Sequence, residues 1–252
     1  MRVKEAIYFA FPFAIADPAF EYEGQSGTVN PARDELPGGN REWYTVGHWM
    51  RVSGSGISAA VIPLDSPLAA FGDINRGLWP KTFAPRSATL FSYVINNYWH
   101  TNFPRVQEGD FTFRYVVTSG SQLGPAELSR MGREALTPLE AGQLKENDKV
   151  EPSRGSLPAA PSSFLEIDSD GVEIEALKPA EDGEGCILRL LETGGSVRQV
   201  LIRSHLLRFE HAWLANAAEE NCAEIEIKDG IELRLKPFEI VTLRLIMHQS
   251  AR

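Results

Sequence analysis

The sequence predicts an all-β protein. Short apolar runs recur along most of the chain and are bounded by clusters of Gly, Pro, Asn and Asp, which is the pattern of strands joined by turns. Sustained helical periodicity is scarce, and a polar, irregular segment separates an earlier block of strands from a later one. These observations predict two β-sandwich domains, one over residues 1–155 and a smaller one over residues 163–252.

The first block is expected to form part of a large sandwich. Its predicted strands run over Ala6 to Phe13, Glu42 to Val52, Ile57 to Pro63, Thr89 to Tyr98 and Asp110 to Thr118. One helix is predicted, from Pro125 to Leu136. Its proline lies in the first turn and Glu127 follows closely, where a carboxylate stabilises the positive end of the helix dipole.

The domain boundary is expected between Glu140 and Ser163, where Pro, Ser and Gly replace any apolar period. Alternation of apolar and polar residues returns after this segment. The later strands are predicted over Ser163 to Ile167, Val172 to Leu177, Cys186 to Leu191, Val197 to Ile202 and within Ala223 to Leu245. This number of short strands suits a small β-sandwich.

A hairpin is predicted around Asp229 and Gly230. A two-residue turn would pair Ile227 with Glu232, which mixes apolar and charged residues on one face. A three-residue loop over residues 228–230, with Gly230 in the left-handed region, instead pairs Ile227 with Ile231 and places Ile225 opposite Leu233. The charged residues then share the solvent face, so the second register is the prediction.

Composition excludes several classes of protein. The 252 residues are 43% hydrophobic and 23% charged, as in ordinary globular proteins, and no apolar run approaches the roughly 20 residues that span a bilayer. The net charge of −9 argues against a nucleic-acid partner, because phosphate binding depends on clustered Lys and Arg. No membrane partner is expected either.

The two cysteines and the first residues bear on the compartment. Cys186 and Cys222 lie far apart and lack the spacing of metal ligands, so reduced thiols and a cytoplasmic location are predicted. The segment 1–13 lacks the anatomy of a signal peptide because Glu5 interrupts it. A predicted strand almost at the first residue indicates that the chain begins inside a larger fold.

The segment Asn96 to Pro104 has the composition of a sugar-binding surface. It combines three aromatic residues, one histidine, three asparagines and a proline. Aromatic faces can stack on the C–H face of a pyranose, while amide and imidazole groups bond to its hydroxyls. The alternative is structural, since amphipathic aromatics often pack inside β-sandwiches and anchor their polar tips to the backbone.

The sequence contains no nucleophile signature, phosphate-binding loop or zinc motif. Its five histidines lack the short paired spacing of metal ligands. Carboxylates are numerous, so a glycosidase pair stays open, and Asp34 and Glu35 are the most suggestive because they lie in a long polar loop before an aromatic segment. The alternative is a surface loop in which Arg33, Asp34 and Arg41 form ordinary ion pairs.

A family resemblance is carried by the order and spacing of several segments. They are Lys4 to Phe13, Asp34 to Gly38, Arg41 to Tyr44, Pro63 to Leu68, Asn96 to Pro104, Phe113 to Tyr115, Ala176 to Asp182 and Leu235 to Leu243. In these segments the chain resembles the C-terminal region of glycoside hydrolase family 38 α-mannosidases and their bacterial relatives, over nearly its whole length.

The resemblance implies a fold and a division of labour. It implies the later part of a galactose-mutarotase-like supersandwich, followed by a small C-terminal β-sandwich domain. In the family an N-terminal catalytic domain holds a zinc ion and the catalytic aspartates of a retaining mechanism. No residue of this sequence maps to those groups, so the resemblance implies no catalytic residue and no metal or cofactor in this chain.

Candidate contacts with a sugar follow from the family's architecture, in which the sandwich can lend side chains to the rim of the sugar site. They are Arg41, Trp43, Tyr44, Asn97, Trp99 and His100. The implied partners are a mannoside-type carbohydrate and an absent N-terminal catalytic domain or partner subunit. An apolar surface left by that domain would favour a homo-oligomer.

Three functional hypotheses are therefore open. The first is a non-catalytic C-terminal region that supports a catalytic domain and lines its sugar site. The second is a free-standing carbohydrate-binding β-sandwich that uses Trp43 and Trp99 as stacking platforms. The third is a self-sufficient glycosidase with a carboxylate pair such as Asp34 and Asp65, which requires one carboxyl group with a raised pKa.

Overall fold

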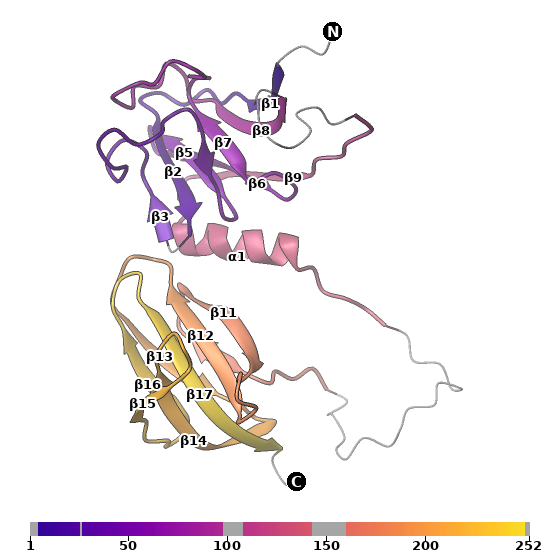
Figure 1. Ribbon diagram of the computed structural model, residues 1–252, viewed down its shortest axis with the longest axis vertical. Helices are drawn as coiled ribbons and strands as arrows, with labels where there is room; N and C mark the ends of the chain where they lie inside the picture. Colours follow the sequence, from indigo (N-terminus) through magenta and orange to yellow (C-terminus); the bar gives the residue numbers. More distant parts are fainter. Residues whose placement is uncertain (1–4, 26, 98–107, 143–159, 250–252) are drawn as a thin grey trace. The chain divides into compact units, whose positions relative to one another are not determined.

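The computed structural model describes residues 5–25, 27–97, 108–142 and 160–249. The chain divides into two compact units, Met1–Pro138 and Leu139–Arg252 (Figure 1). The predicted boundary region lies partly in residues 143–159, outside the described residues.

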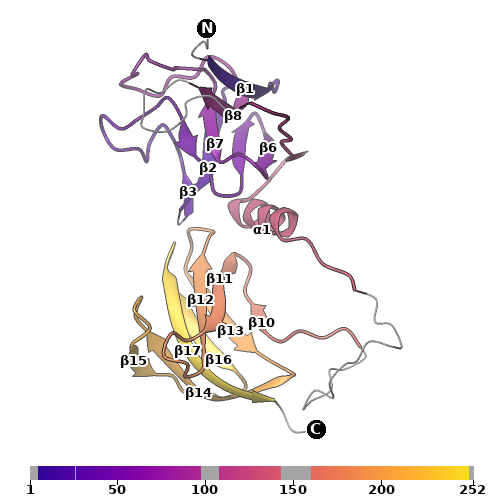
Figure 2. The same cartoon turned by 45° about the vertical axis from the view of Figure 1, so that its right-hand side comes forward.

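The N-terminal unit is a two-sheet sandwich with one helix. Its elements are β1 (Glu5–Phe11), β2 (Ala19–Gly24), β3 (Gly27–Val29), β4 (Tyr44–Thr45), β5 (Met50–Gly54), β6 (Ile57–Pro63), β7 (Leu68–Phe71), β8 (Leu90–Asn97), β9 (Tyr115–Gly120) and α1 (Pro125–Leu136). One sheet has the order β1-β8-β7-β4 and the other β3-β2-β5-β6-β9, with antiparallel neighbours. The paired strands β1 and β8 lie side by side in Figure 2.

The main core of this unit lies between its two sheets. Phe20 and Met50 of the five-stranded sheet meet Phe71 and Leu90 of the four-stranded sheet, and all four side chains are buried. Strand alternation produces this layer, since every second side chain points to the same face.

The helix α1 covers the outer face of the five-stranded sheet. Its fully buried Leu128 packs with Trp49 and Ile62, whose side chains point away from the main core. Gly132 permits the close approach, because a Cβ atom there would lie 2.5 Å from Cβ of His48. From Ser58 to Pro63, β6 is therefore buried on both faces of the sheet.

A polar network fastens α1 to the sheet beside these apolar contacts. Nε1 of Trp49 donates to Oγ of Ser129 at 2.9 Å, and Ser129 donates to Oε1 of Glu23 at 2.6 Å. The backbone N–H of His48 donates to Oε2 of Glu23 at 2.7 Å, and Nδ1 of its ring contacts the same oxygen. Glu23, Trp49 and Ser129, all buried, thus satisfy one another's polar groups.

The C-terminal unit is a second sandwich. Its strands are β10 (Glu166–Asp168), β11 (Val172–Pro179), β12 (Cys186–Glu192), β13 (Arg198–Arg203), β14 (Leu207–Ala215), β15 (Asn221–Glu224), β16 (Ile231–Leu235) and β17 (Ile240–Gln249). They form the sheets β10-β13-β16 and β11-β12-β17-β14-β15. Leu188, Leu243 and Leu245 of the larger sheet pack against Ile202 and Leu235 of the smaller.

The all-β prediction is confirmed, and the predicted bounds of β6 and α1 match those of the structure. The predicted strand from Glu42 to Val52 is wrong, because this segment forms β4 and β5, which lie in different sheets. The chain crosses between the sheets at Gly47, whose N–H donates to the backbone oxygen of Glu23 at 2.7 Å.

The predicted hairpin register is confirmed at its turn and wrong beyond it. Ile227 pairs with Ile231 as predicted, but the N–H of Ile225 donates to Ala212 of β14, and Leu233 pairs with Val200. Gly230 has φ +152° rather than a left-handed helical value. The strands on either side of the turn therefore separate into the two sheets.

Two further findings concern the cysteines and the helices. Cys186 and Cys222 are free thiols. No helix among the described residues is both long enough and apolar enough to cross a membrane.

Candidate functional site

The residues that suit sugar recognition best form an arginine–aromatic cluster in the N-terminal unit. We define this cluster as Tyr8, Trp43, Arg76, Tyr93 and Asn96. β1 supplies Tyr8, β8 supplies Tyr93 and Asn96, and the loops before β4 and after β7 supply Trp43 and Arg76. Segments distant in sequence therefore build one site.

Strand pairing places the two tyrosines together. Tyr8 lies opposite Tyr93 in the β1–β8 register, directly after an irregularity between Ile7 and Tyr8. Residues opposite each other in antiparallel strands project to the same face. Their rings stack with centroids 4.3 Å apart, and the Trp43 ring meets Tyr93 edge-on at 6.2 Å.

Arg76 joins the aromatic rings to the polar end of β8. Its guanidinium carbon lies 5.7 Å from the Trp43 ring centroid and 5.3 Å from that of Tyr93, within the range of cation–π interactions. Its Nη1 donates to the Tyr93 hydroxyl and its Nη2 to Oδ1 of Asn96 at 3.0 Å. One side chain thus orients three others.

The electrostatics keep the phenols of the cluster protonated. Burial raises the pKa of Tyr93 and that of Tyr8, and the negative charge of Glu42 adds to both increases. Glu42 is itself buried and accepts a hydrogen bond from the N–H of Gly77 at 2.6 Å. The cluster therefore combines neutral phenols, an amide and one cation, groups that bond to hydroxyls without supplying a nucleophile.

The structure distributes the predicted sugar contacts unevenly. Trp43 belongs to the cluster, whereas Asn97 lies opposite Glu5 and so projects to the other face of the sheet, where its Nδ2 donates to Oε1 of Glu5 at 3.2 Å. Arg41 instead donates to the backbone oxygen of Pro31 at 2.6 Å. Trp99 and His100 lie outside the described residues.

Tyr44 serves the core. Its side chain is only 5% exposed and packs against Phe71 and Tyr22, with ring centroids 5.1 and 5.5 Å away. Burial raises the pKa of Tyr44 to about 12. This surrounding is that of a packed sandwich residue and not of a surface platform.

Tyr8, Arg76 and Tyr93 are the members that sequence reasoning missed. Arg76 lies in a polar turn without apolar period, and nothing in its local sequence indicates that it reaches β8. Tyr93 reads as an ordinary strand aromatic. Only the pairing of β1 with β8 brings these residues into one cluster.

The proposed carboxylate pair lacks the required electrostatics. A hydrogen bond from Arg33 lowers the pKa of Asp34, and hydrogen bonds from Arg114 lower that of Asp65. Nε of Arg33 lies 2.9 Å from Oδ1 of Asp34, and Nη2 of Arg114 lies 2.8 Å from Oδ1 of Asp65. A general acid needs the opposite shift.

Metal-binding geometry is likewise not seen in the described part of the chain, where no group of three or more His, Cys, Asp or Glu side chains could hold an ion. This finding concerns those residues alone.

Comparison with known proteins gives a family match in the C-terminal unit. Residues 171–243 match the glycosyl hydrolases family 38 C-terminal beta sandwich domain. No curated protein sequence matches the chain significantly.

Two solved structures share the fold of nearly the whole chain. One is an α-mannosidase from Enterococcus faecalis V583, with a TM-score of 0.65 and 16% identity over 95% of this chain. The other is a glycosyl hydrolase family 38 protein from Enterococcus faecalis, with a TM-score of 0.64 and 16% identity, also over 95%. The chain spans 25% and 26% of their respective lengths. Within residues 171–243 the chain therefore carries a C-terminal β-sandwich domain of glycosyl hydrolases family 38, as its sequence indicated.

Proposed function

We propose that this chain acts as the non-catalytic C-terminal β-sandwich region of an α-mannosidase-like glycoside hydrolase. The observation that carries this proposal is the extent of the structural likeness, which includes 95% of this chain but only a quarter of an Enterococcus faecalis α-mannosidase. The family match of residues 171–243 supports it independently. A catalytic domain, in the same protein or in a partner subunit, would hold the zinc ion and the catalytic carboxylates.

In this role the arginine–aromatic cluster would line the rim of the sugar site. The half-buried Arg76 and Asn96 would provide hydrogen-bonding groups for sugar hydroxyls, and Trp43 would provide an apolar ring, while the buried Tyr93 would hold Arg76 in place. The cluster contains neither a nucleophile nor a general acid, so it would position the sugar while the catalytic domain performs bond cleavage.

The second candidate is a free-standing carbohydrate-binding module that uses Trp43 and Trp99 as platforms. The surroundings of Trp43 favour the supporting role over this candidate, because its ring is half-buried and engaged with Tyr93 and Arg76. The burial of Tyr44 also favours the supporting role. The supporting role also includes a homo-oligomer: where no catalytic domain covers its surface, the chain would associate with a second copy of itself through that surface.

Hydrolysis of 4-nitrophenyl α-mannoside by the purified chain tests the proposal. We expect no hydrolysis above the rate in buffer. Hydrolysis that survives a chelator would show that carboxylates of this chain perform the chemistry. Hydrolysis that a chelator abolishes would show that the chain holds its own metal site, and either result contradicts the proposal.

A further inference from the structure

The N-terminal sandwich is open along the side formed by β1 and β9. Each of these strands ends the order of its sheet, so no strand among the described residues pairs with its outer edge. The two strands face each other across the sandwich, because the rings of Phe9 and Phe11 on β1 lie 6.0 and 5.0 Å from that of Tyr115 on β9. We call β1, β9 and the aromatic rings of Phe111 and Phe113 beside them the open side.

Apolar side chains of the open side point into the sandwich but stay exposed. Phe9 alternates with Phe11, which packs against the main core, and Val117 lies opposite Val61 of that core. Both are thus directed toward the inner layer, yet Phe9 is 43% exposed and Val117 52%, whereas Val61 is fully buried. Ile7, on the same face of β1 as Phe9, is 40% exposed. The described residues therefore leave the inner layer uncovered along this side.

Aromatic rings continue this apolar surface beyond β1. Phe113 meets Phe9 edge-on with ring centroids 5.9 Å apart and stacks with Phe111 at 6.5 Å. Phe111 is itself 41% exposed. Deeper in the sandwich, the hydroxyl of Tyr115 donates to Oγ of Ser92 at 3.0 Å and joins the two sheets. An exposed apolar patch on an ordered framework is typical of a protein interface.

The free edges of β1 and β9 lack the usual protection of edge strands. Proteins prevent edge pairing by short strands or by charged side chains. β1 has 7 residues and a single charge, Glu5 at its end, and β9 has 6 residues and no charge. The edges on the opposite side of the same two sheets, β4 and β3, have only 2 and 3 residues. β1 and β9 therefore suit pairing with further strands.

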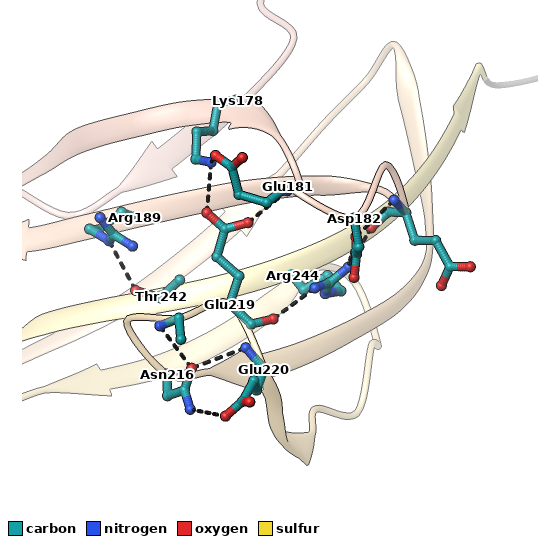
Figure 3. A network of polar contacts seen from close by, with 11 residues as sticks. Lys178, Glu181, Asp182, Arg189, Asn216, Glu219, Glu220, Thr242 and Arg244 are labelled. Carbon is teal, nitrogen blue, oxygen red and sulfur yellow. Dashed lines mark hydrogen bonds and ion pairs between the residues drawn. The ribbon is translucent and has the colours of Figure 1, made fainter.

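The edges of the larger sheet in the C-terminal unit are protected in both ways. Its edge strand β11 carries Glu173, Glu175 and Lys178, and Nζ of Lys178 pairs with Glu219 at 2.7 Å (Figure 3). The strand at its other edge, β15, has only 4 residues, all exposed, and ends in Glu224. Charge and short length thus guard these edges, whereas uncharged residues fill most of β1 and all of β9.

We propose that the open side joins two copies of the chain about a two-fold axis perpendicular to the sheets. In this arrangement β1 pairs antiparallel with β1 of a second copy, and β9 pairs with β9, so that each sheet continues from one copy into the other. One axis serves both pairs because stacked sheets of a sandwich keep their strands within about 30° of one another. Ile7, Phe9 and Val117 of both copies then close a common inner layer.

The geometry of the open side selects a second copy over a single peptide. Two stacked sheets, about 10 Å apart, leave two free edges at this spacing. An extended peptide can pair with one of them, whereas a second copy presents both edges at the same spacing because it is the same sandwich. Its uncharged strands also avoid like charges opposite one another. The inference rests on the homo-oligomer of the proposed function and names its surface and its symmetry.

Sedimentation equilibrium of the whole chain over a range of concentrations tests this arrangement. We expect a monomer–dimer equilibrium for the wild type. Val117→Lys places a charge on the inner face of an edge strand and should raise the dissociation constant of the dimer at least about tenfold, since the dimer would bury two lysines. Val197→Lys, at a valine of the C-terminal unit that is 49% exposed, is the matched control and should leave this constant unchanged.

Hydrogen exchange locates the contact in the same samples. We expect amides of β1 and β9 to gain protection as the dimer forms, while those of β15, an exposed edge strand of the other unit, do not change. If Val117→Lys does not fold, as judged by circular dichroism, Ile7→Lys on β1 takes its place with the same expected direction.

Four results would overturn the inference. They are a chain that stays monomeric, a ladder of larger species that indicates head-to-tail pairing, a dimer that the lysine variant leaves unchanged, and protection that appears away from β1 and β9. A monomer whose β1 and β9 gain protection only when a catalytic segment is added would identify that segment as the occupant. None of these results changes the outcome of the hydrolysis assay, which tests the proposed function separately.

Discussion

The indole N–H of Trp49 and the hydroxyl of Ser129 lie 2.9 Å apart and join the five-stranded sheet to α1. Both side chains are buried, and the Ser129 hydroxyl donates a hydrogen bond to Oε1 of Glu23 at 2.6 Å. The position of the helix on the sheet is therefore determined by hydrogen bonds as well as by the apolar contacts of Leu128.

Removal of this hydroxyl should destabilise the N-terminal unit. Ser129→Ala leaves the buried N–H of Trp49 without an acceptor and takes one donor from Glu23, a loss of about 1 to 3 kcal/mol. Urea unfolding followed by tryptophan fluorescence measures it. Ser119→Ala, an exposed serine on β9, is the control and should shift the midpoint little. Equal midpoints for the two variants would show that the network contributes nothing.

The same network predicts a dependence of stability on acid. Burial raises the pKa of Glu23, but hydrogen bonds from His48 and Ser129 outweigh burial, so the pKa lies below its ordinary value. A carboxylate with a depressed folded pKa contributes stability fully above its unfolded pKa of about 4.3, and this contribution is lost as pH falls through the folded value.

We therefore expect the difference in unfolding free energy between the wild type and Glu23→Gln to be constant near neutral pH and to shrink below about pH 4. Urea unfolding across this pH range measures the difference. Glu134→Gln, a change on the exposed face of α1, should have a small effect throughout. A difference that stays constant on acidification would show that Glu23 gains nothing from its partners.

The turn at Gly230 gives a steric prediction. A Cβ atom there would lie 2.5 Å from the backbone oxygen of Ile202, and the φ of +152° disfavours a side chain. Gly183 also has a positive φ, +81°, but no atom lies within 4 Å of its Cβ position. Gly230→Val should therefore destabilise the C-terminal unit by more than about 1 kcal/mol beyond Gly183→Val. Thermal unfolding compares the two, and equal melting temperatures would refute the prediction.

A test of the arginine–aromatic cluster needs the α-mannosidase-like protein that the proposed function implies, with its catalytic domain. Arg76→Lys keeps the charge but cannot bond to Tyr93 and Asn96 at once in the geometry of a guanidinium. If the cluster lines the sugar site, KM for an α-mannoside should rise about tenfold with little change in kcat, because ground-state and transition-state binding are lost together.

The control for Arg76→Lys is Arg114→Lys, which alters an exposed ion pair with Asp65 and should leave KM unchanged. If Arg76→Lys does not fold, Trp43→Phe takes its place and should raise KM in the same direction. An unchanged KM in a folded variant would place the cluster away from the sugar.

Local patterns predicted β6, a continuous and mostly apolar run, and α1, whose buried residues recur at helical spacing. The predicted bounds of both match the structure. β14 was missed because an irregularity between Phe209 and His211 shifts its apolar residues from one alternation to the other. β2 was missed because its alternation of Phe20, Glu21, Tyr22 and Glu23 is short, and two of its polar positions are carboxylates. Their partners, Arg51 and His48, come from other parts of the chain.

For the candidate site, the sequence offered only the type of each side chain. Its aromatic ring led to the choice of Trp43, which lies in the cluster, and to that of Tyr44, which lies in the core. Arg76 could not be found, because its role depends on a loop reaching β8 across the sheet. The open side of the sandwich depends in the same way on strand register, which turns Phe9 and Val117 toward the inner layer.

The central claim is that this chain supports catalysis performed by another domain. The most direct measurement compares hydrolysis of 4-nitrophenyl α-mannoside by the zinc-binding catalytic segment alone and after this chain is added. The account predicts that the segment alone is inactive or loses its activity rapidly, and that the added chain restores sustained, zinc-dependent turnover. Equal turnover and equal lifetime with and without the chain would contradict it.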